Sequence, residues 1–182
     1  MTRWRTVLLV GLVASAFAVA LVLPRLAVVP DDDMAPSLLA GDLVLVGSGT
    51  PEKGEVVAVV DPLDPSRWTL RRVETIGGAI RYEAGVFLTG TNPRTLEMGR
   101  DDTFVTRTVD DHLVRVRARE VRWEREPVSV PDDAAFLGAD SRDDAVDSRW
   151  WGPLPLAALQ GRVLLRLGAP GHPWRGWLTS TP

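Results

Sequence analysis

The feature that most limits the fold of this chain is an uncharged run near its start, residues 6–23. The run is mostly Val, Leu and Ala, and as a helix its 18 residues would span about 27 Å, close to the hydrocarbon thickness of a bilayer. Arg3 and Arg5 precede it, which favours a cytoplasmic N-terminus over residues 1–5 and an external location for everything after the run. The run therefore predicts a single transmembrane anchor.

A cleavable signal peptide is the alternative interpretation of this run. Ala18-Val19-Ala20 has the small-x-small pattern of a cleavage site. The apolar run continues through Leu23, however, and no polar spacer follows the site. This continuation favours a retained anchor.

The composition of the 182-residue chain argues against several classes of function. The formal net charge is −3, so the chain lacks the basic footprint of a nucleic-acid-binding protein. It has no cysteine, which excludes disulfides and thiolate metal sites. Its two histidines, His112 and His172, are far apart in the sequence, so a zinc site or a histidine-based triad has few candidate parts. We expect no metal, no cofactor and no nucleic-acid partner.

After the anchor, short apolar or alternating runs are separated by Gly, Pro and Asp, which is typical of strands. Regularly spaced strands with almost no helix predict a mainly β fold, either a barrel or a folded sandwich. We expect strands at residues 43–46, 56–60, 68–76, 80–82, 86–88, 104–109, 113–118, 134–138 and 162–167.

Three further features complete the expected architecture, in which the β domain covers residues 24–167 and a tail follows it. Glu83-Ala84-Gly85 is typical of a hairpin turn with Gly85 at positive φ. One short helix is expected at residues 155–160, ended by Gly161. Residues 168–182 form a tail rich in Pro, Gly and Trp, in which Trp174 and Trp177 either lie at the lipid interface or cap the core.

Four motif-bearing segments follow one another along this domain. They are Asp33-Met34-Ala35-Pro36-Ser37-Leu38 with Gly41-Asp42-Leu43-Val44 after it; Lys53-Gly54-Glu55-Val56-Val57; Leu70-Arg71-Arg72-Val73; and Gly138-Ala139-Asp140-Ser141-Arg142, followed by Asp147-Ser148-Arg149 and Trp151-Gly152. This ordered set resembles the type I signal peptidases, from the anchor to about Leu167. The resemblance implies a signal-peptidase-like antiparallel β domain against the outer, periplasmic or extracytoplasmic, face of a bacterial cytoplasmic membrane.

The chain departs from that family where the chemistry is done. In the family, the serine before the methionine attacks the peptide carbonyl and a neutral lysine takes its proton; these positions hold Asp33 and Arg71 here. Arginine stays protonated in proteins, so it cannot act as the base, and a carboxylate is a poor nucleophile towards an amide. The family's side-chain oxyanion donor corresponds to Asp31, which has no proton to give, and its orienting serine corresponds to Ala145.

The resemblance also implies which residues lie where the family has its substrate cleft, here called the former cleft. The last segment is one residue longer than the family's pattern, around Ala139, and with that insertion Asp147 and Arg149 match the family's Asp and Arg. We do not expect the nucleophile to have moved to Ser37.

The apolar stretch that ends at Leu39 either binds an extended chain by strand addition or contacts lipid or a partner's transmembrane helix. The former cleft is expected to contain Met34, Pro36, Ser37, Leu38, Arg72, Asp147 and Arg149.

The replaced residues are complementary in charge. Because the family holds these two side chains in hydrogen-bond contact, we expect Asp33 and Arg71 to form a charge-assisted ion pair with a structural role. The alternative is that Asp33 faces solvent. The acidic run around Asp33 has two interpretations as well, an oxygen-rich cation site or a solvated acidic face, and the lack of EF-hand spacing favours the second. The carboxylates in question are Asp31, Asp32, Asp33, Asp140, Asp143, Asp144 and Asp147.

The loss of base, nucleophile and oxyanion donor favours a pseudopeptidase that serves as a binding or structural subunit of a membrane assembly. One alternative is an active type I signal peptidase that removes signal peptides from exported precursors by unorthodox residues. Another is a free-standing binder of signal peptides or of the tails of exported proteins. The expected partners are membrane lipid and either a membrane protein or an extended peptide.

Overall fold

The structure is a computed structural model that describes residues 24–83, 86–89, 95–100, 104–109, 112–117, 126–142 and 145–168. The predicted anchor and the Trp-rich tail lie outside these residues, so their predicted bounds stay predictions. Among the described residues, no helix has the length and apolar character needed to cross a membrane.

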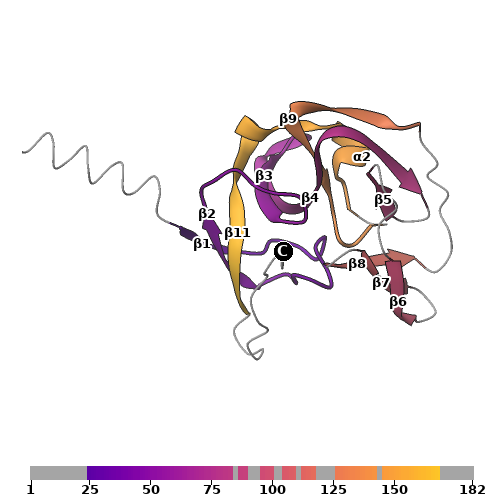
Figure 1. Ribbon diagram of the computed structural model, residues 1–182. Helices are drawn as coiled ribbons and strands as arrows, with labels where there is room; N and C mark the ends of the chain where they lie inside the picture. Colours follow the sequence, from indigo (N-terminus) through magenta and orange to yellow (C-terminus); the bar gives the residue numbers. More distant parts are fainter. Residues whose placement is uncertain are drawn as a thin grey trace, which may run out of the picture.

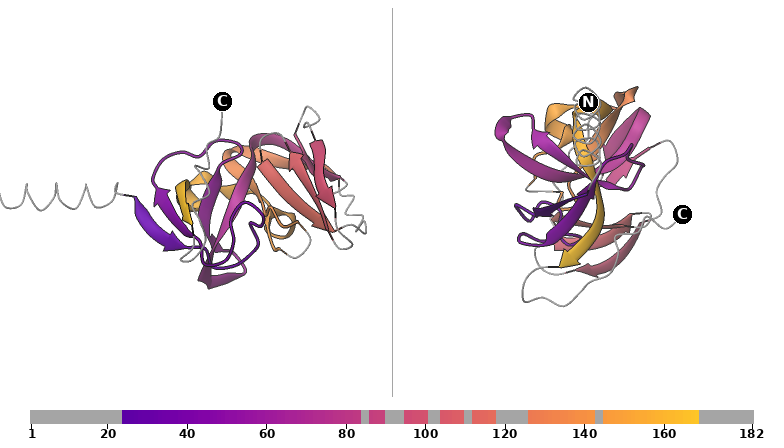
Figure 2. Two further views of the ribbon diagram at one scale, coloured as in Figure 1. Left: turned by 90° about the horizontal axis from the view of Figure 1, so that it is seen from below. Right: turned by 90° about the vertical axis from the view of Figure 1, so that its left-hand side faces the viewer.

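Two antiparallel sheets make up the described part of the chain, which confirms the predicted mainly β class (Figure 1). The larger sheet has the strand order β1-β2-β11-β3-β4-β9-β10, with β5 paired to β4, and the smaller has the order β6-β7-β8. β1 lies at one end of the molecule and β6 to β8 lie at the other (Figures 1 and 2). The bounds are β1 Arg25–Val28, β2 Leu43–Gly47, β3 Val56–Asp61, β4 Asp64–Glu83, β5 Val86–Leu88, β6 Thr95–Arg100, β7 Phe104–Val109, β8 His112–Arg117, β9 Val128–Gly138, helix α2 Ser148–Trp151, β10 Leu154–Pro155, 3₁₀ helix η1 Leu156–Ala158 and β11 Leu159–Gly168.

The 20-residue strand β4 joins the two halves of the larger sheet. It pairs with β3 at its start, with β9 along its second half and with β5 at its end. The two strands predicted at residues 68–76 and 80–82 are therefore one strand. Gly77 and Gly78 lie between them at φ 67° and 79°, where the pairing with β9 shifts register, so this glycine pair forms an irregularity within the strand and not a turn. Arg81 pairs with Leu88 as the predicted hairpin requires, while its turn residues 84 and 85 lie outside the described residues.

The predicted helix at residues 155–160 is wrong. Only Leu156–Ala158 is helical, as one 3₁₀ turn, and β11 begins at Leu159 because it pairs with β3 and β2. This pairing overrides the helix propensity of the Leu-Ala-Ala-Leu-Gln sequence. Helix α2, β1 and β6 were not expected from the sequence.

Three clusters of apolar side chains form the core. One of them packs the loop between β1 and β2 onto the sheet, because Met34 and Leu38 of that loop are completely buried among side chains of β2, β3 and β4. A second cluster packs Trp151 of α2 against Val57, Val73 and Leu137 of three neighbouring strands. The core thus fixes both segments that lie on either side of Arg71.

Candidate functional site

The loop that carries Asp33 is held in place along its whole length. At its two ends, Val29 N–H donates to Asp42 O and Gly41 N–H donates to Val29 O. In its middle, Arg166 of β11 donates to Ser37 O and forms an ion pair of 2.6 Å with Asp42. The site is therefore built on a fixed segment.

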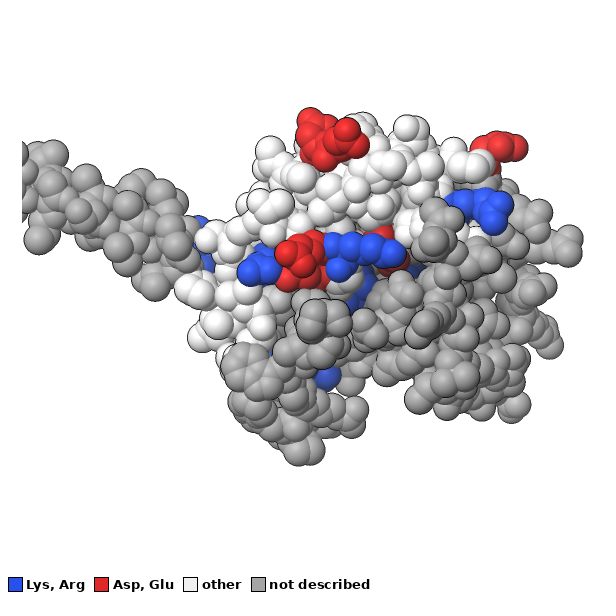
Figure 3. All heavy atoms as spheres, in the orientation of Figure 1, with Lys and Arg blue, Asp and Glu red and all other residues white. Residues whose placement is uncertain are grey.

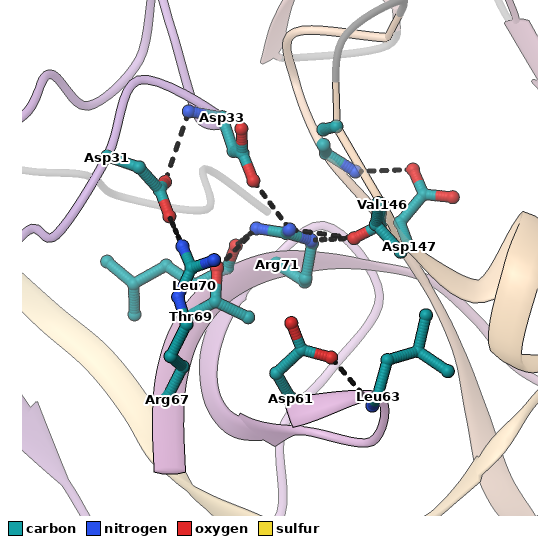
Figure 4. A network of polar contacts seen from close by, with 12 residues as sticks. Asp31, Asp33, Asp61, Leu63, Arg67, Thr69, Leu70, Arg71, Val146 and Asp147 are labelled. Atoms are coloured by element: carbon teal, nitrogen blue, oxygen red, sulfur yellow. Dashed lines mark hydrogen bonds and ion pairs between the residues drawn. The ribbon is translucent and has the colours of Figure 1, made fainter. Parts of the chain in front are cut away.

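Arg71 lies on β4 at the centre of the site, with its side chain 3% exposed (Figure 4). A guanidinium has five N–H donors, and each one of Arg71 has an acceptor. Nε and Nη2 donate to Val146 O at 3.0 and 2.7 Å, Nη1 donates to Thr69 Oγ1 and Leu70 O at 2.6 Å each, and Nη2 also donates to Asp33 Oδ2 at 2.6 Å. The structure thus brings Asp33 and Arg71 into direct contact.

Asp33 is the more exposed partner, with 26% of its side chain accessible. Burial raises the pKa of its carboxyl and the nearby Asp31 adds to the rise, while the attraction of Arg71 opposes it. The effect of burial on this pKa is larger than the effect of Arg71. The cost of burying the Asp33 charge therefore offsets much of the attraction between the two charges, and the contact is best described as a hydrogen bond to a buried cation.

Asp31 accepts a hydrogen bond from the main chain of Asp33. Asp33 N–H donates to Asp31 Oδ1 at 3.2 Å, and Asp31 Oδ2 lies 4.0 Å from Arg67 Nη2 on β4 (Figure 4). A main-chain N–H at the nucleophile's position is the kind of donor that forms an oxyanion hole. Here a carboxylate already accepts from it.

Ala145, at the position of the family's orienting serine, is buried directly before Val146. Its methyl group can neither donate nor accept a hydrogen bond. What this segment offers Arg71 is the main-chain carbonyl of the next residue, Val146.

A second buried ion pair lies next to the first. Arg72 donates from Nε and Nη2 to the two carboxylate oxygens of Asp140 at 2.8 and 2.5 Å. Its Nη2 also donates to Ser37 Oγ at 3.2 Å. The Ser37 hydroxyl therefore lies beside a cation and not beside a base.

Asp147 and Arg149 form a third pair, at the start of α2. Arg149 donates to both carboxylate oxygens of Asp147, which also accepts from Ala139 N–H and caps the helix. Asp140 and Asp147 are completely buried, so the predicted solvated acidic face is wrong for these two residues, and each is neutralised by an arginine instead. Asp143 and Asp144 lie outside the described residues, within which no group of metal-ligating side chains gathers.

The structure also corrects the predicted apolar lining. Met34 and Leu38 belong to the core and cannot line an open cleft, Pro36 is half-buried, and Leu39 alone of this stretch has an exposed side chain. Apolar side chains in a loop give the same sequence signal whether they turn inward or outward. Only the packing against β2 decides between the two.

Sequence reasoning missed the main-chain acceptors of Arg71 and the role of Thr69, since a carbonyl group has no sequence signature. One sequence feature bears on the missing base, because a lysine elsewhere in the chain could replace the one that Arg71 replaces. Lys53 is the single lysine of the chain, and it lies in an exposed turn where its Nζ donates to Thr89 Oγ1 at 3.0 Å.

One face of the molecule carries charges of both signs. On the face shown in Figure 3, acidic and basic side chains lie next to one another, and no broad area of a single charge appears among the described residues. This mixture agrees with the net charge of −3.

The chain resembles known proteins along most of its length. It is 26% identical over 151 residues to a probable signal peptidase I-2 of Synechocystis sp., covering 76% of this chain and 60% of that protein. It is 38% identical over 50 residues to a probable thylakoidal processing peptidase 2 of Arabidopsis thaliana, covering 28% of this chain and 14% of that protein. The chain thus spans less than two thirds of the length of either relative.

A solved structure of a signal peptidase I from Enterococcus faecalis is 17% identical and covers 63% of this chain and 97% of its own, with a TM-score of 0.39. The family itself is shown by the sequence, because the pattern described as "Signal peptidase, peptidase S26" matches residues 1–167. The chain belongs to this signal peptidase family.

Proposed function

We propose that this protein is a non-catalytic member of the signal peptidase family that serves as a binding or structural subunit of a membrane assembly. The observation that carries the proposal is the contact between Arg71 and Asp33, in which every donor of the guanidinium is already in use. The apolar run at residues 6–23, which lies within the family match, supports a single-span anchor in a bacterial cytoplasmic membrane with the β domain outside.

The chemistry of the replaced pair supports the absence of serine-lysine proteolysis. Peptide cleavage of that type needs a group that gives up a proton and a neighbour that accepts it. A guanidinium stays protonated near neutral pH and so cannot accept a proton, and an ionised carboxylate has no proton to lose. Lys53 is the one lysine that could replace the base, and it is exposed and donates to a threonine.

That contact between Lys53 and Thr89 is also the one observation in favour of an active enzyme with unorthodox residues. It joins an amine to a hydroxyl at 3.0 Å, which is the kind of couple that serine-lysine chemistry uses. It lies on an exposed turn, however, away from the water-excluded surroundings that strengthen such chemistry. We therefore keep it as the second candidate.

A cleavage assay separates these two functions. The full-length protein in detergent is mixed with a precursor that carries an Ala-x-Ala site, and the products are identified by mass spectrometry. We expect no cleavage by the wild type or by the Asp33→Ala and Lys53→Ala variants. Turnover that disappears in either variant would contradict the proposal, and the variant in which it disappears would identify the pair that acts.

Isolation from native membranes in mild detergent separates a subunit from a free-standing binder. We expect a partner in fixed stoichiometry, as a structural or binding subunit requires. Recovery of the protein alone, or with a heterogeneous set of exported precursors, would favour the role of binding signal peptides or exported tails.

A further inference from the structure

Strand β4 has one edge without a strand partner over its first residues. Residues 64–72 of β4 pair with β3, but β9 begins to pair only at Arg72, so the other edge of residues 64–71 is open among the described residues. An open edge presents main-chain N–H and C=O groups that an extended chain can pair with.

The direction of these main-chain groups follows from their neighbours. Val73 accepts from Gly54 N–H and donates to Glu55 O, so its own groups point to the side of β3. Because the direction alternates along a strand, the groups of Leu70 and Trp68 point to the open side. Leu70 O is therefore an acceptor that an added strand would use.

Arg71 already occupies this acceptor. Its Nη1 donates to Leu70 O at 2.6 Å, and the same guanidinium also reaches Val146 O and Asp33 on the two facing segments. A second contact crosses the same space four residues earlier on β4, where Arg67 lies 4.0 Å from Asp31. Figure 4 shows both contacts running from β4 to the segment of Asp31 and Asp33.

The geometry points to Arg71 as an internal plug that closes a peptide-binding edge: its guanidinium uses Leu70 O and Val146 O, the acceptors that the main-chain N–H groups of an extended peptide would otherwise take. The inference rests on the proposed function, since an active protease would have to admit its substrate along a strand edge. The ligand that the opened edge fits is an extended chain with free main-chain N–H groups, because both of the freed acceptors are main-chain carbonyl oxygens.

The test measures the binding of a fluorescent peptide that contains Ala-Leu-Ala to the full-length protein in detergent, by fluorescence anisotropy. Removing the plug in Arg71→Ala frees two carbonyl acceptors, so we expect binding at least about tenfold tighter than to the wild type. The double variant Asp33→Ala/Arg71→Ala is measured as well, because it leaves no unpaired carboxylate and remains usable if the single variant fails to fold. The matched control is Arg162→Ala. It breaks the 2.6 Å ion pair between Arg162 of β11 and Glu55, and it should leave the affinity unchanged.

A peptide with N-methylated main-chain amides shows whether strand addition is responsible. It should lose the gain in affinity, since it has no N–H groups to donate. A folded double variant that binds no tighter than the wild type, or an N-methylated peptide that binds equally well, would overturn the inference. Cleavage of the peptide by the wild type would defeat the proposed function, and it is read separately in the same samples by mass spectrometry.

Discussion

The pair of Asp33 and Arg71 shows how two replacements change what a site can do with a proton. Burial raises the pKa of the Asp33 carboxyl, with Asp31 adding to the rise and Arg71 opposing it, so folding makes this carboxyl easier to protonate. What the fold needs from position 33 is therefore an oxygen that accepts from Arg71 Nη2. It does not need the negative charge itself.

This reasoning predicts different effects for two substitutions of Asp33. Asp33→Ala leaves a buried N–H of Arg71 without an acceptor and should lower the free energy of unfolding by about 2 kcal/mol. Asp33→Asn keeps an acceptor oxygen and should cost about 0.5 kcal/mol or less. Urea unfolding of the full-length protein in detergent measures both. Asp133→Asn, at an exposed position of β9, is the matched control and should have no effect.

The pH dependence of the same variants has a definite sign. Because the pKa of Asp33 is higher in the folded state, the folded protein binds more protons between the unfolded and the folded pKa values, and the wild type loses stability as the pH rises through the range that begins at the ordinary carboxyl value of about 4. Asp33→Asn lacks this loss, so it should gain relative to the wild type over that range. Glu74, whose pKa burial also raises, is present in both proteins and cancels in the comparison. A relative gain by the wild type instead would mean that the attraction of Arg71 dominates.

The sequence predicted this pair of residues only through the family resemblance, which supplied the information that positions 33 and 71 are neighbours. The rest of the site could not be predicted, for a physical reason. Val146 and Leu70 contribute carbonyl groups, which every residue has. Asp140 looked like a surface residue because its partner, Arg72, lies 68 positions away in the sequence, and a local pattern cannot show that two such residues neutralise each other.

At the scale of the elements, strands were easier to predict than their connections. The runs at residues 43–46, 56–60 and 104–109 gave clear β signals and are strands. Gly77 and Gly78 suggested a break because glycine favours turns, but positive φ also suits a register shift within a long strand. The residues after Pro155 suggested a helix because propensity is local, whereas the pairing of β11 with β2 and β3 is not.

Gly138, the last residue of β9, has a packing role that leads to a prediction. A Cβ atom there would meet Arg142 Nη1, and it would lie 2.6 Å from both Glu74 Oε1 and Phe87 Cε2. Arg142 and Glu74 form a buried ion pair, and the Arg142 guanidinium lies over the Phe87 ring at 4.4 Å, so none of the three can easily move away. Gly138→Ala should lower the free energy of unfolding by about 2–3 kcal/mol.

The matched control for Gly138→Ala is the same substitution at Gly47 in β2. There a Cβ atom would meet only the flexible end of the Leu164 side chain, which can change rotamer, so we expect a loss below about 1 kcal/mol. Thermal unfolding followed by circular dichroism compares the two variants. Equal losses of stability would show that the buried pair of Arg142 and Glu74 makes room for the added methyl group as easily as the Leu164 side chain does.

At the scale of the whole molecule, the described β domain begins directly after the apolar run. Residue 24 is the first described residue and β1 starts at Arg25, so the sheet and the predicted anchor are separated by a single residue. The exposed apolar side chains of Leu26 and Val28 on β1 extend the apolar character of that run. An anchor that stays in the membrane would therefore hold the domain close to the bilayer surface, on the side that the arginines before the run select.

The lack of cysteine in the chain makes this topology directly measurable. A single cysteine is introduced either in the N-terminal segment, as Thr2→Cys, or on the exposed surface of β9, as Asp133→Cys, and the wild type serves as an unlabelled blank. In intact bacterial spheroplasts, a membrane-impermeant maleimide should label Asp133→Cys and should label Thr2→Cys only after permeabilisation, because positive charges before the run keep the N-terminus inside. Labelling in the opposite order would contradict the orientation. If the run were instead removed as a signal peptide, the permeabilised Thr2→Cys protein would lose the label from its full-length band, whereas a retained anchor keeps the label and the domain on one chain.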